Sequence, residues 1–374
     1  MAKPTLKEIY RSNHNETSRH AFVGALKGYL NGPLEDRLAH CYEEQLKPAF
    51  VGKHGRAPGN RREGNEAFDG EHLFQLWGSS VFTSQNLMWE AVDQTCVRVL
   101  PEFEARWESL ASGDALGRLE LAQNLVLPDP IAQVEIHRQP GGYFGMLGDM
   151  SLRPGMNYLG TGELYRAAKG LSDGGKVGDP VMGNYMIGAL QRRFPDAKPL
   201  SILDLGCGVG VQTIAYKQTF ANADVWALDL SAPFLKFAHV WAEDNGLAIN
   251  YRQGDARHTG FADGKFDLIV SHILFHETWH DIVPGIMKEA YRLLAPGGIF
   301  LNGDIPYQPD RLSIPKQVTN DWQVVNNGEP FWTGYADMDM RQALIDAGFD
   351  SHTVFTDYDP IGQRELYIFG GVKI

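Results

Sequence analysis

The stretch Ile202-Leu-Asp-Leu-Gly-Cys-Gly-Val-Gly210 decides the fold. It starts as a short apolar run, typical of a buried strand, and ends in a loop with glycines at positions 206, 208 and 210. A helix is expected from about Val211. Without Cβ atoms the loop backbone can approach a ligand closely, and the N-terminus of the helix favours anionic groups. A nicotinamide-binding fingerprint needs glycine at position 211, where this chain has valine.

Short apolar runs and helical patterns alternate after this loop. The strand-like runs cover residues 224–228, 249–252, 266–270 and 299–302. The helical patterns cover residues 181–194, ahead of the loop, and then 232–245, 279–294 and 337–347. This alternation predicts parallel βαβ units and an open sheet with helices on both faces. The last two runs, 352–356 and 365–369, have a link too short for a crossover helix, so we expect an antiparallel edge pair.

The first 150 residues have a different and mainly helical pattern. Residues 33–49 and 73–110 carry apolar side chains at helical spacing, whereas residues 133–136 alternate like a short strand. Glycine is dense between Gly141 and Gly178, which suggests a linker or a mobile lid. The sequence therefore predicts a mainly helical domain over residues 1–150 and a sheet domain over residues 151–374. The second domain includes the connector over residues 151–178.

Composition limits the partners of the chain. Its 374 residues carry a formal net charge of −12, whereas a nucleic-acid-binding surface needs clustered positive charge. One basic cluster lies in a Gly- and Asn-rich stretch that we interpret as a mobile loop: Lys53, His54, Arg56, Arg61 and Arg62. No apolar run has the length of a membrane span, none at the start resembles a signal peptide, and three scattered cysteines suggest free thiols. We expect a cytoplasmic protein that binds neither nucleic acid nor a membrane.

Acidic residues follow the strands at regular places. Asp229 closes the strand after the glycine loop, where a carboxylate can accept hydrogen bonds from both hydroxyls of a ribose. Gly254-Asp255-Ala256 follows the next strand, where a carboxylate and a backbone amide can recognise an adenine edge. The stretch Leu294-Ala-Pro-Gly-Gly-Ile-Phe-Leu301 combines a helix end, a tight turn and another strand. Ligands of open α/β sheets bind at the carboxyl ends of the strands, where these residues stand.

This ordered set resembles the class I S-adenosylmethionine-dependent methyltransferase family, over roughly residues 178–374. The resemblance implies a doubly wound, seven-stranded, mostly parallel Rossmann-like sheet and S-adenosylmethionine as cofactor, with S-adenosylhomocysteine as product. It also implies a set of cofactor-binding residues. The methionine moiety would lie on Asp204, Gly206, Cys207, Gly208 and Gly210, the ribose on Asp229 and Leu230, the adenine on Asp255 and Ala256, and the sulfonium beside Ser271 and His272.

Several of these residues also have a purely structural interpretation. Asp229 can cap the following helix, and Asp255 can belong to a turn. Asp204 can support the loop from inside the strand without touching a ligand. Cys207 fits a small packing residue better than a nucleophile.

The segment Ser271-His-Ile-Leu-Phe-His-Glu-Thr-Trp-His280 is the main candidate for catalysis. His272, His276 and His280 recur every four residues, and if the segment is helical they share one face. In one interpretation His272 or His276 is the general base for a hydroxyl acceptor. In the others the three histidines bind a metal ion, or they form a packed and hydrogen-bonded face. We do not expect these histidines to bind a metal ion.

The acceptor side is less defined by sequence. Asp304 and Tyr307, just past the strand at 299–302, stand where this family often contacts acceptors. Tyr143 lies with His137 and Arg138 on a Gly/Pro-rich segment that can fold over the open edge of the sheet. Further candidates are the aromatic residues Trp322, Phe331 and Trp332, which fit a plain core as well, and Tyr158 and Tyr165.

The function implied by the resemblance is methyl transfer to a small-molecule acceptor, with a hydroxyl oxygen as the preferred target. The alternatives are N-, C- or S-methylation of a small metabolite or a protein side chain, and a non-catalytic cofactor-binding scaffold. Ser271-His272-Ile273-Leu274 stands where base-methylating enzymes carry an Asn/Asp-Pro-Pro-aromatic motif, which disfavours nucleic acid. The N-terminal helices would roof the acceptor pocket or form a homodimer.

Overall fold

The computed structural model describes residues 4–111, 113–129, 131–142, 152–168, 177–361 and 364–374. Within them, one sheet has the order β1-β4-β3-β2-β5-β6-β8-β7. Its strands are β1 (Leu119–Glu120), β2 (Ser201–Leu205), β3 (Asp224–Asp229), β4 (Asn250–Gln253), β5 (Phe266–His272), β6 (Leu294–Asp304), β7 (Phe355–Ile361) and β8 (Arg364–Val372). Strands β1 to β6 pair in parallel, and β8 pairs antiparallel with both β6 and β7. The doubly wound sheet and its antiparallel edge pair are confirmed.

The sheet has one strand more than the seven predicted. The additional strand, β1, comes from the N-terminal region and pairs Leu119 with Tyr251 of β4. It has only two residues, too few for an alternating pattern to be visible in the sequence.

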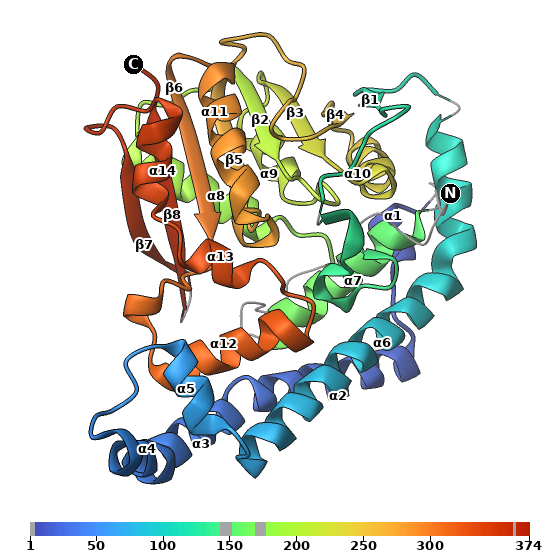
Figure 1. Ribbon diagram of the computed structural model, residues 1–374. Helices are drawn as coiled ribbons and strands as arrows, with labels where there is room; N and C mark the ends of the chain where they lie inside the picture. Colours follow the sequence, from blue (N-terminus) through green and yellow to red (C-terminus); the bar gives the residue numbers. More distant parts are fainter. Residues whose placement is uncertain (1–3, 112, 130, 143–151, 169–176, 362–363) are drawn as a thin grey trace.

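Helices cover both faces of the sheet (Figure 1). On one face lie α8 (Val181–Arg193), α9 (Thr213–Thr219) and α10 (Ala232–Asp244), and on the other lie α11 (Val283–Leu293) and α14 (Met340–Ala347). Successive residues of β2 show the division, because Ile202 packs in the first core and Leu203 in the second. Side chains that alternate along a strand reach opposite faces, so two separate cores arise from one run of apolar residues.

The N-terminal helices form a second layer below the sheet (Figure 1). They are α1 (Leu6–Ile9), α2 (His14–Leu30), α3 (Pro33–Cys41), the π-helix Tyr42–Leu46, α4 (Lys47–His54), α5 (Arg61–Phe68), α6 (His72–Ala111) and α7 (Arg153–Ala168). The long helix predicted over residues 73–110 is confirmed by α6. Helix α7 packs against α2 and α6 on one side and α10 on the other. The core on that face is therefore continuous, from Val92 of α6 to Phe237 of α10.

Helices α12 (Ile314–Asn326) and α13 (Trp332–Ala336) connect the two layers at the other end. Helix α12 lies against α3 and α5. The rings of Trp322 and Trp77 pack edge to face, with their centroids 5.1 Å apart. No helix in the described ranges combines the length and the apolar character that crossing a membrane requires.

Two local predictions are wrong. The basic stretch expected to be a mobile loop contains the end of α4 and all of α5, which Asn60 caps by accepting a hydrogen bond from the Glu63 amide. Four of its five basic side chains contact carboxylates, since Lys53 and His54 pair with Glu66, Arg56 with Glu63 and Arg61 with Asp337. The strand expected over residues 133–136 is replaced by two 3-10 turns, Ile131–Gln133 and Ile136–Arg138. Positive φ values at His137 and Arg138, 55° each, end any extended run there.

The junction between α7 and α10 gives a test of the shared core. A Cβ at Gly155 would lie 2.4 Å from the Cβ of Phe237, whereas one at Gly162, on the same helix, would meet nothing within 4 Å. We expect Gly155→Ala to lower the free energy of unfolding by about 1–3 kcal/mol through overpacking. Gly162→Ala, the matched control, should raise it by about 0.5–1 kcal/mol because alanine favours a helix. Urea titrations measure both, and a neutral Gly155→Ala would contradict the close packing of the two layers.

Candidate active site

A cavity of about 1640 Å³ opens at the carboxyl ends of the parallel strands. Its sheet side is formed by residues that follow β2 to β6, among them Gly206, Asp229 and His272. Its other side is formed by the N-terminal helices and the segment after them, with Trp89, His137 and Tyr158. One cavity therefore joins the glycine loop to side chains from the N-terminal region.

The glycine loop has a left-handed backbone at three positions. The φ angles of Gly206, Gly208 and Gly210 are 69°, 53° and 69°, a region that side chains other than glycine rarely adopt. A Cβ at Gly206 would lie 2.5 Å from Leu274, and one at Gly210 would lie 2.7 Å from Ala238. At Gly208 the nearest atom would be 3.8 Å away, on Tyr158, so this part of the loop leaves room for a ligand. Gly206, Cys207 and Gly208 line the cavity, and Gly210 does not.

Asp229 ties the end of β3 to this loop. One carboxylate oxygen accepts a hydrogen bond from the Gly208 amide at 2.8 Å, and the other accepts one from the Ser231 amide at 2.8 Å. Burial raises the pKa of Asp229 to about 6, and the hydrogen bonds from the backbone oppose that shift. The carboxylate lines the cavity together with Leu230.

The other predicted cofactor residues fall into two groups. Asp255 and Ala256 line the cavity, but the Asp255 carboxylate also accepts hydrogen bonds from the backbone and the guanidinium of Arg257. Asp204 and Ser271 do not line it. Asp204 is fully buried behind the loop, where it accepts a hydrogen bond of 2.6 Å from the Thr213 hydroxyl, and Ser271 donates to Asn302.

The three histidines do not share a helix face, because the segment that carries them is not an α-helix. His272 ends strand β5, His276 lies in the 3-10 turn Phe275–Glu277, and His280 begins the 3-10 turn His280–Ile282. The chain reverses at Ile273, whose φ of 57° interrupts any regular element. His280 is half exposed and pairs with Asp281, away from the other two. A spacing of four residues fits one helix, but here strand β5 continues as far as His272.

His272 is held by a tyrosine and a carboxylate. Its Nε2 lies 3.0 Å from the hydroxyl of Tyr216, and the two rings stack. Its Nδ1 lies 4.0 Å from Asp204. The side chain lines the cavity beside the glycine loop, so it is near the place where the resemblance puts the sulfonium.

His276 is enclosed by two carboxylates. Its Nδ1 lies 2.5 Å from Asp304, which also accepts a hydrogen bond from the Phe275 amide, and its Nε2 lies 2.9 Å from Glu277. Burial lowers the pKa of His276, but the charges of Asp304 and Glu277 raise it to about 10 overall. The ring is therefore an imidazolium at neutral pH. It lines the cavity, while Asp304 lies behind it and positions it.

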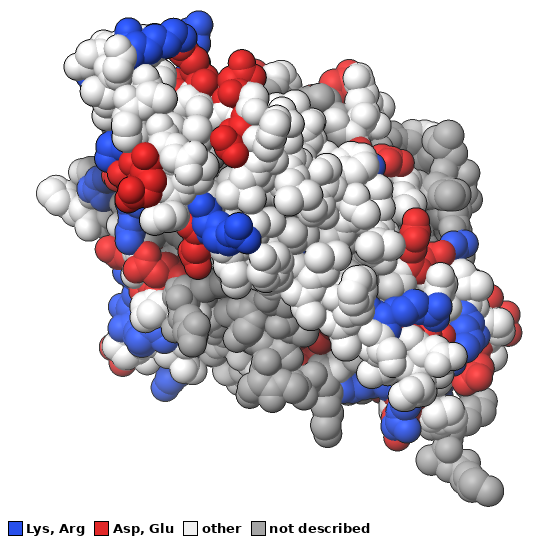
Figure 2. Space-filling model, turned by 90° about the horizontal axis from the view of Figure 1, so that it is seen from below, with Lys and Arg blue, Asp and Glu red and all other residues white. Residues whose placement is uncertain are grey.

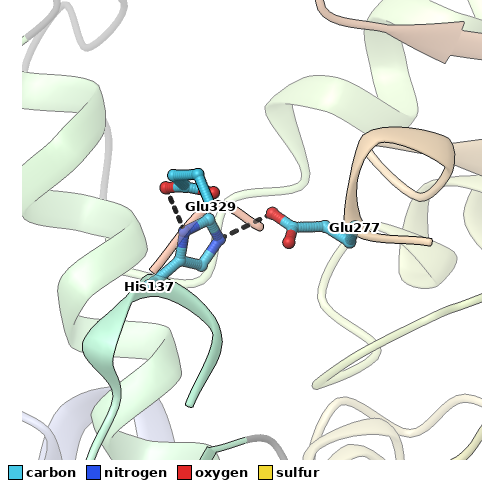
Figure 3. Close-up of side chains that lie close together, drawn as sticks. All are labelled: His137, Glu277 and Glu329. Carbon is cyan, nitrogen blue, oxygen red and sulfur yellow. Dashed lines mark hydrogen bonds and ion pairs between the residues drawn. The ribbon is translucent and has the colours of Figure 1, made fainter. Parts of the chain in front are cut away.

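Glu277 also contacts a residue from the N-terminal region, His137. Its carboxylate lies 2.9 Å from Nε2 of His137, whose Nδ1 lies 2.6 Å from Glu329 (Figure 3). His137 was an acceptor-side candidate from its sequence, whereas no motif marks Glu277 or Glu329 as a site residue in its own right. Glu329 stands in an Asn/Gly/Pro-rich stretch with no recognisable motif, so only the folded chain brings it to the site.

The remaining acceptor candidates differ in place. Tyr307 and Trp332 line the cavity, and their ring centroids lie 4.9 Å apart. Trp322 and Phe331 belong to the packing around it. Tyr143 and the side chain of Tyr165 lie outside the described residues.

Known proteins match the half of the chain that carries the sheet. The family model described as a methyltransferase domain matches residues 202–298. An uncharacterized methyltransferase of Synechocystis is 31% identical over 181 residues, which cover 46% of this chain and 73% of that protein. The chain therefore belongs to the class I S-adenosylmethionine-dependent methyltransferase family.

Other relatives match over shorter stretches. Malonyl-[acyl-carrier protein] O-methyltransferase of Xylella fastidiosa is 34% identical over 36% of this chain and 44% of its own length. Trans-aconitate 2-methyltransferase of Deinococcus radiodurans is 32% identical over 33% of this chain and 45% of its own length. The chain thus spans less than half the length of these two relatives. Among solved structures, phosphoethanolamine N-methyltransferase 2 of Haemonchus contortus aligns with a TM-score of 0.41 and 17% identity, over 51% of this chain and 52% of that one.

Proposed function

We propose that this protein transfers a methyl group from S-adenosylmethionine to a hydroxyl oxygen of a small-molecule acceptor. The observation that carries the proposal is the single cavity that joins the glycine loop and Asp229 to the buried His276. A relative named for methylation of trans-aconitate supports a small acceptor, and one named as an O-methyltransferase supports oxygen as the methylated atom. The N-terminal helices close the cavity from the other side, as a roof over the acceptor would.

The cofactor fits the residues at the carboxyl edge of the sheet. Gly206, Cys207 and Gly208 would hold its methionine part, with Asp204 and Gly210 as supports of the loop. Asp229 and Leu230 would hold the ribose, and Asp255 with Ala256 the adenine. The room above Gly208, which a Cβ would begin to fill, is the structural reason for this fit. Bound there, the cofactor supplies an electrophilic methyl group.

The residues of this chain would then align the acceptor and exclude water. His272 lies beside the glycine loop, and Tyr307 and Trp332 form an aromatic wall farther along the cavity. In-line displacement needs the acceptor oxygen, the methyl carbon and the sulfur held in a row, away from competing water. The ring of Trp89 and the loop that carries His137 enclose the site from the N-terminal side.

We assign the general base to His276. Asp304 holds its Nδ1, so its Nε2 is the atom that would take the acceptor proton when the hydroxyl replaces Glu277 as its neighbour. A raised pKa makes the imidazole a strong base that is available in small amounts at neutral pH. His272, whose Nε2 already faces the Tyr216 hydroxyl, is assigned a positioning role.

The partners and location follow from composition and surface. We propose that the acceptor is not a nucleic acid, because on the face in Figure 2 the described Lys and Arg side chains lie scattered among carboxylates. Retarded migration of DNA or RNA in a native gel would contradict this. Three buried, free cysteines fit a reducing compartment such as the cytoplasm, which fractionation of cells would test.

The proposed homodimer has a candidate surface on the N-terminal helices. Phe22 of α2 is 63% exposed, and Leu76 and Val97 of α6 are 58% and 49% exposed. Such side chains are commonly covered in an interface. We expect light scattering after gel filtration to give twice the chain mass of 41.6 kDa and the double variant Leu76→Glu, Val97→Glu to give the monomer mass. A monomeric wild-type protein would refute the dimer.

Asp229 gives a test of the cofactor site. Only its ionised carboxylate can accept hydrogen bonds from both ribose hydroxyls, and bonds to charged groups are worth about 1.5–3 kcal/mol. We expect Asp229→Asn to weaken S-adenosylhomocysteine binding at least about tenfold in calorimetry. Binding to the wild type should weaken as pH falls through about 6, where the raised pKa lets Asp229 take up a proton, and the variant should lack this dependence.

The control is Asp263→Asn, because Asp263 is 81% exposed and lies at the opposite edge of the sheet, where it pairs with Arg292. The affinity of Asp263→Asn for S-adenosylhomocysteine should equal that of the wild type. Unchanged affinity in Asp229→Asn would remove Asp229 from the cofactor site.

His276 gives a test of the base. Loss of a general base costs roughly 10²–10⁴-fold in turnover, so His276→Gln should lose that much while S-adenosylhomocysteine affinity stays intact. The wild-type rate should rise with pH up to about 10, where His276 loses its proton, and the variant should lack this rise. An equal and specific loss in His272→Gln with normal turnover in His276→Gln would move the base to His272.

A further inference from the structure

His137, Glu277 and Glu329 come together from three separate parts of the chain. His137 lies in the 3-10 turn Ile136–Arg138, Glu277 ends the turn Phe275–Glu277, and Glu329 precedes α13. One potential ligand atom from each lies within 4.8 Å of the others. Figure 3 shows the two carboxylates on different sides of the imidazole, each directed at one ring nitrogen. From this geometry we propose that the three side chains bind one divalent transition-metal ion at the wall of the acceptor cavity.

Unused carboxylate oxygens are the first reason. The side chains of Glu277 and Glu329 are 8% and 5% exposed, yet within the described part of the chain Oε2 of each has no hydrogen-bond partner. A buried polar atom without a partner costs free energy, and a buried charged one costs more. Both residues line the cavity, so an ion can reach them from solvent. A cation held by these oxygens would supply the missing partner.

The charge of the buried cluster is the second reason. Three carboxyl groups (Asp304, Glu277 and Glu329) face two imidazoles (His137 and His276), and these side chains are largely buried. The carboxyl groups outnumber the imidazoles, so a divalent cation bound among them would offset negative charge that is otherwise buried.

The proton-only alternative is an imidazolium of His137 held between two carboxylates. Burial alone would lower the pKa of His137, but the charges of Glu277 and Glu329 raise it well above its usual value. This arrangement needs no ion, but it leaves the two Oε2 atoms without partners. Measurement of the bound metal separates the two states.

Rigid placement of His137 favours a ligand role. Its carbonyl accepts hydrogen bonds from Gln85 at 2.7 Å and Trp89 at 2.9 Å, and its amide donates to the carbonyl of Gly328 at 2.7 Å. The backbone is fixed in a left-handed conformation, with φ at 55°. Three backbone contacts therefore fix the point from which the side chain of His137 extends before any ion arrives, and preorganisation of this kind favours metal binding.

The ligand set indicates the class of ion. One imidazole nitrogen and two carboxylates suit Zn²⁺, Mn²⁺, Fe²⁺ or Co²⁺ better than Ca²⁺ or Mg²⁺, which prefer oxygen ligands alone. Three protein ligands leave coordination positions open toward the cavity, where an oxygen of the acceptor could bind. Metal binding does not depend on the identity of the methyl donor or acceptor, so this site extends the proposed function without resting on it.

The test uses the full-length protein after removal of metal with a chelator. Before that removal, elemental analysis of the protein as purified gives the number of bound ions. Calorimetric titration of the metal-free protein with Zn²⁺ and Mn²⁺ then measures stoichiometry and affinity. Titration with Co²⁺ adds a visible absorption spectrum that reports the ligands of the ion. We expect one ion per chain. His137→Gln and Glu329→Gln should weaken binding by at least about 100-fold, since loss of outer-shell partners alone costs about 10–100-fold.

The control variant is His280→Gln, which changes a half-exposed histidine that pairs with Asp281 outside the cluster. It should bind the ion like the wild type. S-adenosylhomocysteine binding, measured for each variant, shows that the chain is folded and reads the proposed cofactor site separately. Lack of a bound ion in the wild type, or an unchanged affinity in Glu329→Gln, would overturn the metal site in favour of the imidazolium.

Discussion

Polar groups buried at the carboxyl edge of the sheet must find partners, and this constraint organises the site. The six parallel strands β1 to β6 end at that edge, and the layer of N-terminal helices lies below it (Figure 1). Asp204 and Ser271 lie behind the cavity wall, where Asp204 accepts a hydrogen bond from Thr213 and Ser271 donates one to Asn302, and so they brace the loop and the strand. Asp229, Glu277 and Glu329 face the cavity. The distinction between support and ligand follows from which carboxylates reach the cavity.

The same constraint explains how the N-terminal layer is attached. The turn at His137 would leave a buried carbonyl without a partner, and Gln85 and Trp89 of α6 both donate to it. Gln85 is in turn held by Lys27 of α2, a buried lysine whose ammonium donates to the amide oxygen at 2.7 Å. A polar chain thus runs from α2 through α6 to the cavity wall. The position of His137 is thus tied to that of helices α2 and α6 through defined hydrogen bonds.

The sequence predicted what depends on neighbours along the chain. The alternation of apolar runs and helical patterns gave the sheet, because each strand and helix carries its own periodicity. The glycine loop was recognisable because three positions need a left-handed backbone within five residues. The spacing of His272, His276 and His280 fits a helix, but the segment is not helical. Strand β5 ends at His272, and the chain reverses at Ile273. Two-residue β1 and the capped helix α5 were missed because their signals are weak or were masked by glycine and charge.

The acceptor side could not be predicted for a related reason. His137 and Glu329 are 192 residues apart and meet only after both layers have packed. The segment that matches the methyltransferase family, residues 202–298, contains His276 and Glu277 but neither of those two. The family model therefore covers the edge of the sheet that would hold the cofactor and stops short of His137 and Glu329 on the opposite wall. Glu277 is the point at which the matched segment meets that wall, because its carboxylate lies 2.9 Å from Nε2 of His137.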